Sequence, residues 1–233
     1  MPLRPRIPDR RRGFTLTELL VVVAIMALLT TVGLPSIGGI GSAGKMTQAV
    51  VELSGLMDQA RQYAVAQNTY VWIAFLKDTT AQNQDQVTVA VIASQDGTDP
   101  NPAPGGAYDY GAVPNASLVL LGKVRSFSQL QLKAAGTFTA SDIASLAGLP
   151  AAGTANDLSS QATFHVPLPG AAAAAFTQSI VFLPTGEARN GAGPIDLLEF
   201  GLEPEKTQAA LLAANAAVVR ISGLTGQTMV YRR

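Results

Sequence analysis

One carboxylate stands inside a long apolar run near the start of the chain. Glu18 is the only charged residue between Phe14 and Leu34. An acid near the end of a helix in hydrocarbon costs on the order of a few kcal/mol unless it protonates, reaches the headgroups or meets a cation. The chemistry that Glu18 offers is therefore ion pairing, and the pairing partner has to be identified.

The other residues with reactive side chains form no catalytic or metal-binding motif. The chain has no cysteine, which excludes disulfides, thiolate metal sites and cysteine nucleophiles. His165 is the only histidine, and its setting in TFHVPLPG, a strand running into a Pro-Gly turn, predicts a structural or surface role. Asp96, Asp99 and Asp109 lack the alternating spacing of a calcium loop. We expect no enzyme activity, cofactor or metal, since known catalytic motifs and phosphate loops are absent from the sequence.

The apolar run has the length of a membrane span. At about 1.5 Å per residue, residues 14–34 form a helix of roughly 31 Å, the thickness of a hydrocarbon core. Arg10, Arg11 and Arg12 precede the run, and positive residues hold that end of a span in the cytoplasm. The sequence predicts a single-pass protein whose body lies outside the cytoplasm.

An ordinary secretory signal peptide is the competing interpretation. The tripeptide at residues 41–43, GSA, offers a small-x-small cleavage site, which would leave a chain starting at Gly44. However, the apolar region of such a signal usually has about 7 to 15 residues and contains no acid. The length of the run and Glu18 favour the anchor. An ordinary secreted or membrane-anchored β-domain protein stays as an alternative.

The N-terminal motif resembles a known processing signal. Residues 13–20, GFTLTELL, preceded by the arginines, are similar to the type III signal of type IV pilins and type II secretion pseudopilins. This resemblance implies that a prepilin peptidase cuts between Gly13 and Phe14 and methylates the new amine of Phe14. It also implies that Glu18 pairs with the terminal amine of a neighbouring subunit during assembly. Pro35 falls where many pilins carry a helix-kinking proline.

The resemblance also implies a fold and a location. A pilin-like α+β fold joins a long N-terminal helix, half transmembrane and half amphipathic, to an antiparallel β-rich domain. We therefore expect a basic leader at 1–13, the helix at 14–68 and a β-rich domain at 69–233. The expected partners are the prepilin peptidase, other pilin or pseudopilin subunits and the inner membrane. The β-rich domain would lie in the periplasm, and at the cell surface once assembled.

Helical periodicity continues beyond the apolar run. Residues 36–44, SIGGIGSAG, favour a loosened or kinked stretch after Pro35. Residues 45–67 then carry apolar residues at spacings of 3 and 4, which predicts an amphipathic helix packed on a sheet. A coiled-coil seam is the weaker alternative. The apolar stripe consists of Met46, Val50, Leu53, Met57, Ala60 and Ala64.

The remainder is predicted to consist of strands and turns. Strands are expected at 70–75, 87–92, 118–121, 127–132, 179–183 and 196–200, and the first two form a hairpin. A long loop is expected at 95–116, an insertion at 139–161, and a small helix at 204–215 with Pro204 in its first turn. The chain ends in a hairpin of strands 218–221 and 228–231 around GLTG at 223–226.

Two C-terminal segments narrow the resemblance. IVFLPTGEARN at 180–190 and the closing hairpin resemble the H-type minor pseudopilins of type II secretion. The ending ISGLTGQTMVYRR resembles a narrower group of prepilin-like proteins known as Verru_Chthon cassette protein D. Many major pilins close a C-terminal loop with a disulfide, so the lack of cysteine favours a minor pilin or pseudopilin.

Charge is distributed unevenly along the chain. The first 13 residues have a net charge of +4 and the remainder has −4. An acidic body argues against nucleic-acid binding by the whole surface. Arg220, Arg232 and Arg233 form a small basic patch beside Tyr231 that could make a short, salt-sensitive contact. A DNA- or ligand-binding tip module is therefore the alternative to a purely structural subunit, with nucleic acid the less favoured partner.

Overall fold

The structure is a computed structural model of the 233-residue chain. It describes residues 15–79, 85–99, 108–134, 155–158, 162–168, 173–190, 193–204 and 216–232, and for residues 30–43 the helical backbone alone. The chain divides into two compact units, Met1–Gly41 and Ser42–Arg233.

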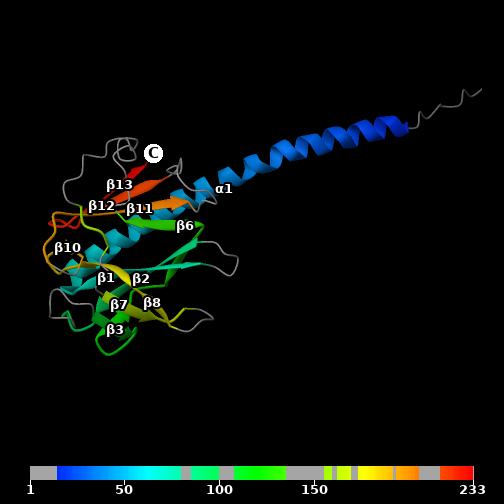
Figure 1. Cartoon of the computed structure of the whole chain (residues 1–233). Helices are drawn as coiled ribbons and strands as arrows, with labels where there is room; N and C mark the ends of the chain where they lie inside the picture. Colours follow the sequence, from blue (N-terminus) through cyan, green and yellow to red (C-terminus); the bar gives the residue numbers. More distant parts are fainter. Residues whose placement is uncertain are drawn as a thin grey trace, which may run out of the picture. The chain divides into compact units, whose positions relative to one another are not determined.

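One helix, α1 (Leu16–Gln67), begins in the first unit and ends in the second (Figure 1). Its backbone is helical throughout residues 36–44, where the glycines predicted a loosened stretch. The side chain of Pro35 lies outside the described residues, so its kink stays a prediction. The helix stops at Asn68, whose φ of 51° is the left-handed conformation that asparagine tolerates just beyond a helix end.

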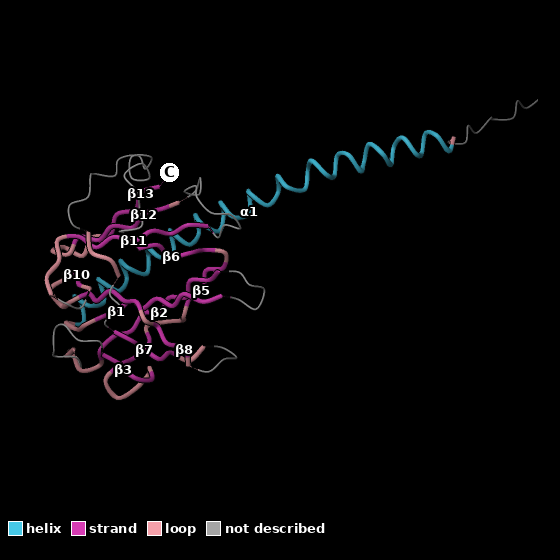
Figure 2. Tube along the Cα trace, in the orientation of Figure 1, coloured by secondary structure: helices cyan, strands magenta, loops and turns pink. Residues whose placement is uncertain are grey.

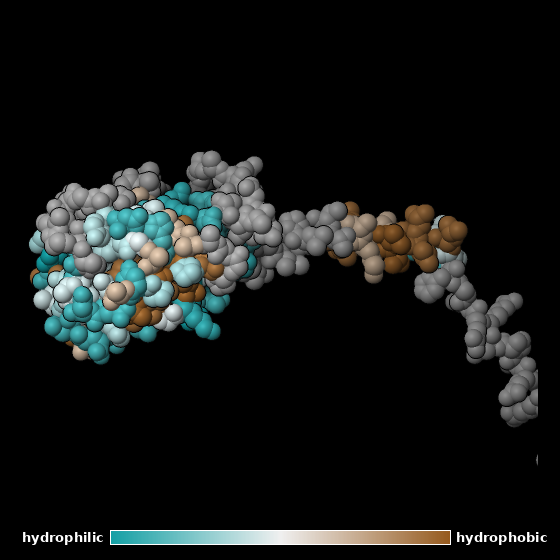
Figure 3. Space-filling view, turned by 90° about the horizontal axis from the view of Figure 1, so that it is seen from below, coloured by the Kyte–Doolittle hydropathy of each residue, from teal (hydrophilic) through white to brown (hydrophobic). Residues whose placement is uncertain are grey.

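The first unit presents apolar side chains along the start of α1. Every described residue from 15 to 29 is exposed, and the large apolar side chains there are 47% to 82% exposed (Figure 3). Among the described residues, no helix has both the length and the hydropathy required to cross a membrane. The predicted span 14–34 lies partly outside this set, because Phe14 and the side chains of residues 30–34 are not described.

The apolar stripe of α1 forms one side of the main core of the second unit. All six stripe residues are at most 4% exposed. They belong to the same buried cluster as Val71, Ile73 and Phe75 on alternate positions of strand β1. The stripe is thus buried within its own chain, and the coiled-coil alternative is wrong.

The described strands form three sheets (Figure 2). The central sheet has the order β10-β9-β1-β2-β4, with β5 also paired to β2; the second has the order β13-β12-β11-β6, and the third β3-β7-β8. Of these pairs only β3 and β7 run parallel. The strands are β1 (Val71–Thr79), β2 (Asp85–Ser94), β3 (Tyr108–Ala112), β4 (Leu118–Leu120), β5 (Arg125–Ser128), β6 (Leu130–Ala134), β7 (Ala162–Val166), β8 (Ala174–Phe176), β9 (Gln178–Phe182), β10 (Ala188–Arg189), β11 (Leu197–Pro204), β12 (Ala217–Ser222) and β13 (Thr228–Arg232).

The central sheet is covered on both faces, which explains why residues 71–76 of β1 and 89–93 of β2 are continuously apolar. One face packs on α1 and on the second sheet, where the rings of Phe75 and Phe200 are 5.5 Å apart at their centroids. The opposite face carries Trp72, whose ring lies 5.9 Å from Phe164 and 5.5 Å from Tyr110 of the third sheet. Two cores therefore form on the two sides of one sheet.

Two predicted boundaries are wrong. β3 lies inside the segment 95–116 predicted as a loop, because Tyr110 is buried against Trp72, a contact that local composition does not reveal. The strand predicted at 127–132 is in fact β5 and β6, which are separated by Gln129 with a φ of 62°. This left-handed residue lies where the chain passes from the central sheet, through β5, to the second sheet, through β6.

The predicted helix at 204–215 does not begin at Pro204. That proline instead ends β11 and pairs with Leu130 of β6. Residues 205–215 lie outside the described residues, as does most of the insertion predicted at 139–161. The closing hairpin is confirmed as β12 and β13.

Two glycine turns contact each other beside the end of α1. A Cβ on Gly226 (φ 64°) would overlap the carbonyl oxygen of Gly186 (φ 87°), so only glycine allows the two backbones to meet. Arg61 of α1 donates from Nε to the Thr225 carbonyl oxygen at 2.7 Å. The Ala188 amide donates to the Gly223 carbonyl oxygen at 2.8 Å. The segments IVFLPTGEARN and ISGLTGQ therefore meet in space.

We predict that Gly226→Ala destabilises the second unit far more than Gly122→Ala. Both glycines have positive φ, but a Cβ on Gly122 would meet open space. The control should lose about 1 kcal/mol from backbone strain alone, and Gly226→Ala roughly 3 kcal/mol or more from strain plus overlap. Denaturant unfolding of the full chain in detergent, followed by fluorescence of the single tryptophan, measures both. Equal losses would show that the two turns are not tightly packed.

Candidate assembly site at the start of the helix

A reciprocal hydrogen-bond pair closes the N-terminus of α1. Thr15 precedes the helix, and the Glu18 amide donates to Thr15 Oγ1 at 3.3 Å. In return, the Thr15 amide donates to Glu18 Oε2 at 3.0 Å, and the Thr15 hydroxyl donates to the same oxygen at 3.0 Å. This is a capping box, in which two otherwise unpaired backbone donors of the first helical turn are satisfied by side chains.

The capping box changes how the charge of Glu18 is accommodated. Its carboxylate accepts two hydrogen bonds from Thr15, and it stands in the first turn, where the helix dipole favours a negative charge. One carboxylate has about four acceptor positions, so an amine can still bind while the cap is intact. Glu18 is thus held in a defined position and retains capacity for a cation.

The structure describes only some of the other predicted site residues. Gly13 and Phe14, the predicted cleavage pair, lie outside the described residues, and so does Arg233. Thr15 was not predicted as a site residue. The signal that identifies it is the pattern Thr-x-x-Glu directly before an apolar helical run.

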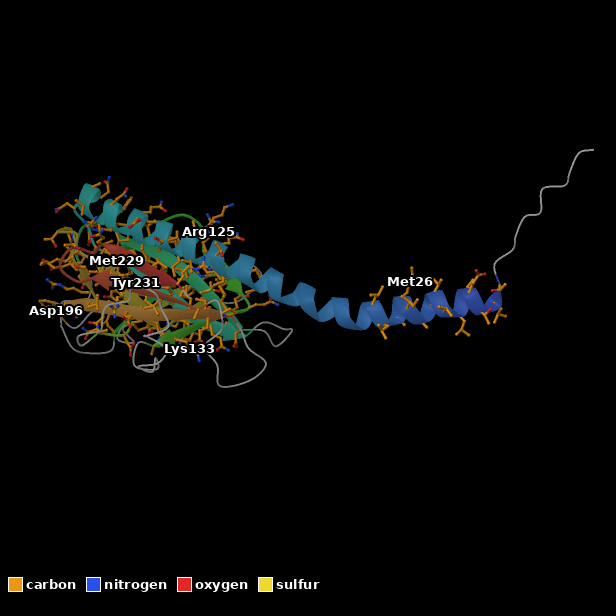
Figure 4. All side chains as sticks on the ribbon, turned by 90° about the horizontal axis from the view of Figure 1, so that it is seen from above. Met26, Arg125, Lys133, Asp196, Met229 and Tyr231 are labelled. Carbon is orange, nitrogen blue, oxygen red and sulfur yellow. The ribbon has the colours of Figure 1, made fainter. Side chains whose placement is uncertain are left out.

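The predicted basic patch is not formed by exposed arginines. Arg220 is 3% exposed and donates from Nε to Glu199, which is 1% exposed and lies directly opposite it on β11. Its guanidinium carbon also lies 5.7 Å from the ring centroid of Tyr231, which Figure 4 labels on β13. Arg232 donates to the Thr47 hydroxyl of α1 at 3.1 Å. Arg220 therefore stabilises the second sheet, and its position does not favour contact with nucleic acid.

His165 lies beside a carboxylate on the third sheet. Its Nε2 is 3.1 Å from Oδ2 of Asp109, and the two residues come from the parallel strands β7 and β3. The pKa of the Asp109 carboxyl is lowered, mainly because the Gly111 amide donates to it at 2.8 Å and also because His165 binds it. Both side chains are partly exposed and no nucleophile is seen to contact them in the described part of the chain. The pair stabilises the β3–β7 contact.

Cavities and acids in the described residues add no catalytic centre. A polar hollow of about 530 Å³ lies where α1 ends, lined by residues that include Asn68, Ser94 and Asp96. The pKa of Asp96 is lowered because Thr98 and Ser94 donate to its carboxylate. No group of three or more potential metal ligands is found among the described residues.

The N-terminal segment matches a known family. Residues 8–34 match the family described as the prokaryotic N-terminal methylation motif. Two fimbrial proteins of Pseudomonas aeruginosa are similar to this chain, 30% and 29% identical over 98 residues. Each alignment covers 38% of this chain and 64% of the fimbrial protein, so the chain spans less than two thirds of the length of these relatives. No solved structure matches.

These similarities confirm the resemblance to the type IV pilin and pseudopilin family. The chain resembles pilins: it carries a prepilin-type N-terminal motif, and its described residues form an α+β arrangement of one helix and a β-rich domain. These matches do not confirm the narrower resemblances to H-type pseudopilins and to Verru_Chthon cassette protein D.

We predict that Thr15→Ala frays the start of α1. Loss of a threonine cap costs about 1 kcal/mol, which corresponds to roughly fivefold faster amide hydrogen exchange in the first helical turn. Thr17→Ala is the matched control, because Thr17 contacts the Thr15 hydroxyl but takes no part in the capping box. Exchange measured by mass spectrometry on the full chain in detergent tests this. Unchanged exchange in Thr15→Ala would contradict the cap.

We predict an acid-sensitive contribution from Asp109. Because its pKa is lower in the folded chain than in the unfolded one, its stabilisation is present above the unfolded value of about 3.9 and is lost as the pH falls through the lower folded pKa. Asp109→Asn should therefore flatten the acid limb of the unfolding free energy below about pH 4. An identical pH profile for the variant and the natural chain would refute this contribution.

Proposed function

We propose that this chain is a structural subunit, a minor pilin or pseudopilin, of a type IV pilus-like or type II secretion pseudopilus fibre. The observation that supports it most is the capped Glu18 inside the matched methylation motif at residues 8–34. The two relatives are fimbrial proteins, which agrees with a role in a fibre.

Processing would supply the missing charge partner of Glu18. A prepilin peptidase would cut between Gly13 and Phe14, remove the five leader arginines, and leave a methylated amine on Phe14. Phe14 directly precedes Thr15, the capping residue that binds Glu18, so the new amine would be close in sequence to the carboxylate. The amine of the same chain or of a neighbouring subunit can then bind the carboxylate oxygens that Thr15 leaves open.

The apolar run would anchor the subunit before assembly. We propose that residues 14–34 span the inner membrane, that the N-terminus is cytoplasmic, and that the β-rich domain is periplasmic. The exposed apolar side chains of residues 15–29 suit burial in lipid or among other helices (Figure 4 labels Met26 among them). Burial of the charged Glu18 in either setting favours a cationic partner.

A minor pseudopilin of the H type is the subclass that we propose. IVFLPTGEARN and the closing hairpin, which carried that resemblance, form the two turns that contact each other beside Arg61. The role is structural and non-catalytic. Nucleic-acid capture is not proposed, since Arg220 is engaged with Glu199 inside the second sheet.

Two variants of Glu18 separate charge from capping. Glu18→Gln keeps an acceptor for the Thr15 donors but removes the charge, whereas Glu18→Val removes both. We expect both to be cleaved normally and both to be lost from sheared fibres, by roughly tenfold or more, because an unpaired partner amine is costly in an apolar core. Incorporation of Glu18→Gln at normal levels would mean that only the cap matters.

Intact-mass analysis of the chain from its native membrane tests the processing step. A mass that corresponds to residues 14–233 plus one methyl group is expected. A chain that retains its arginine leader, or one that starts at Gly44, would overturn the proposed function.

A further inference from the structure

The polar hollow at the end of α1 has the size of a ligand site. Its volume of about 530 Å³ lies within the range of roughly 300 to 1,000 Å³ that small-molecule sites occupy. Tyr63 and Gln67 of α1 form one wall, Gln95 and Asp96 directly follow β2, and Val119 belongs to β4. These residues lie apart in sequence from the N-terminal segment on which the proposed function depends, so a ligand bound here would serve a second role.

The helix end and the loop after β2 are fastened to each other around the hollow. The buried Thr69 hydroxyl donates to the Ser94 carbonyl oxygen at 2.8 Å, and the Ser94 amide donates to the Tyr70 carbonyl oxygen at 2.9 Å. A Cβ on Gly97 (φ 75°) would lie 3.3 Å from the Asn68 carbonyl oxygen, so glycine allows the loop to approach the helix end closely. The hollow is therefore preformed within the second unit.

Two acceptor side chains of the hollow are fixed by hydrogen bonds of their own. Gln95 donates from Nε2 to the Asn115 carbonyl oxygen at 2.9 Å, and its Oε1 can still accept from a ligand. The Asp96 carboxylate accepts from the Thr98 hydroxyl at 2.8 Å, from the Thr98 amide at 3.0 Å and from the Ser94 hydroxyl at 2.8 Å. All three bonds go to Oδ1, so Oδ2 has acceptor positions for a ligand. Groups that are fixed beforehand lose little conformational entropy on binding.

The chemistry of the lining selects the class of ligand. Among the described lining residues Asp96 is the only charged one, which disfavours an anion, and the polar walls disfavour an apolar molecule. One exposed carboxylate holds a cation weakly, because surface ion pairs contribute little. A neutral molecule with several hydroxyl groups can use this carboxylate together with the carboxamides of Gln67, Asn68 and Gln95. The half-buried Tyr63 adds an aromatic ring, which can pack on the C–H groups of a sugar.

We infer that this hollow is a binding site for a neutral saccharide unit. Neighbouring hydroxyl groups of the sugar donate to Asp96 Oδ2 and Gln95 Oε1, and the Gln67 carboxamide donates to a ring or hydroxyl oxygen. The ring of Tyr63 packs on one face of the sugar. Binding is non-covalent and leaves the sugar unchanged. Because the hollow is open to water, a monosaccharide should bind with a dissociation constant of about 1 mM.

Titration of single sugars into the full chain tests the site. The chain is kept in a detergent without a sugar headgroup, and glucose, galactose, mannose and N-acetylglucosamine are added one at a time. Saturation-transfer NMR measures binding, and micelles without protein give the background. At least one of the four sugars should bind with a dissociation constant of about 1 mM. N-acetyl-arginine amide is titrated in the same way as a cationic probe.

Substitutions in the lining locate the binding. Asp96→Asn keeps an oxygen for the Thr98 donors but removes the charge, and it should weaken sugar binding by about tenfold. Gln67→Ala, at an exposed helical position, should weaken it by about fivefold. Asp58→Asn and Gln62→Ala are the matched controls, because both residues are exposed on α1 and neither lines the hollow. Fluorescence of the single tryptophan during unfolding shows that each variant is folded.

Three results would overturn the saccharide site. The first is a lack of saturation transfer to all four sugars. The second is sugar binding that both lining variants leave unchanged, which would place the sugar elsewhere on the chain. The third is tighter binding of N-acetyl-arginine amide than of every sugar, which would show that the hollow takes a cationic group. None of these results bears on the proposed function, which the intact mass and the fibre content of the chain test separately.

Discussion

Burial of the α1 stripe against the central sheet is the interaction on which the rest of the second unit depends. The sheet needs α1 on one face because the adjoining parts of β1 and β2 carry buried apolar residues on both faces, and the third sheet covers the opposite face. A sheet that must be dry on both sides has to be covered by a helix and by further strands. Everything else, including the second sheet and the locked turns, is arranged around this requirement.

The same helix serves two environments. From Met46 onward it has one buried stripe, but its described N-terminal part exposes apolar side chains on all sides. Such a segment has no core of its own and needs lipid or other helices around it. Glu18 is compatible with that setting because Thr15 donates two hydrogen bonds to its carboxylate in the capping box. The carboxylate can also accept a hydrogen bond from an amine. In the proposed function, anchoring and assembly would thus be joined in one short segment.

Close backbone contacts and buried charge account for much of the C-terminal half. Gly186 and Gly226 allow two turns to come into contact. Arg61 of α1 donates a hydrogen bond to one of these turns. Arg220 and Glu199 pair across β12 and β11 inside the second sheet, where losing either partner would leave a buried charge. Closely packed turns beside the end of α1 are the structural product of these contacts.

The sequence by itself determined the features that depend on near neighbours. Patterns of a few residues predicted the motif at residues 13–20, the stripe from Met46 to Ala64 and the closing hairpin. Such patterns do not depend on residues that are distant in sequence. Only the tertiary structure decided that Tyr110 belongs to a strand, that Pro204 ends one, and that Arg220 is buried. Each of these outcomes depends on a partner distant in sequence, and the physical reason is that burial is a property of the assembled layers.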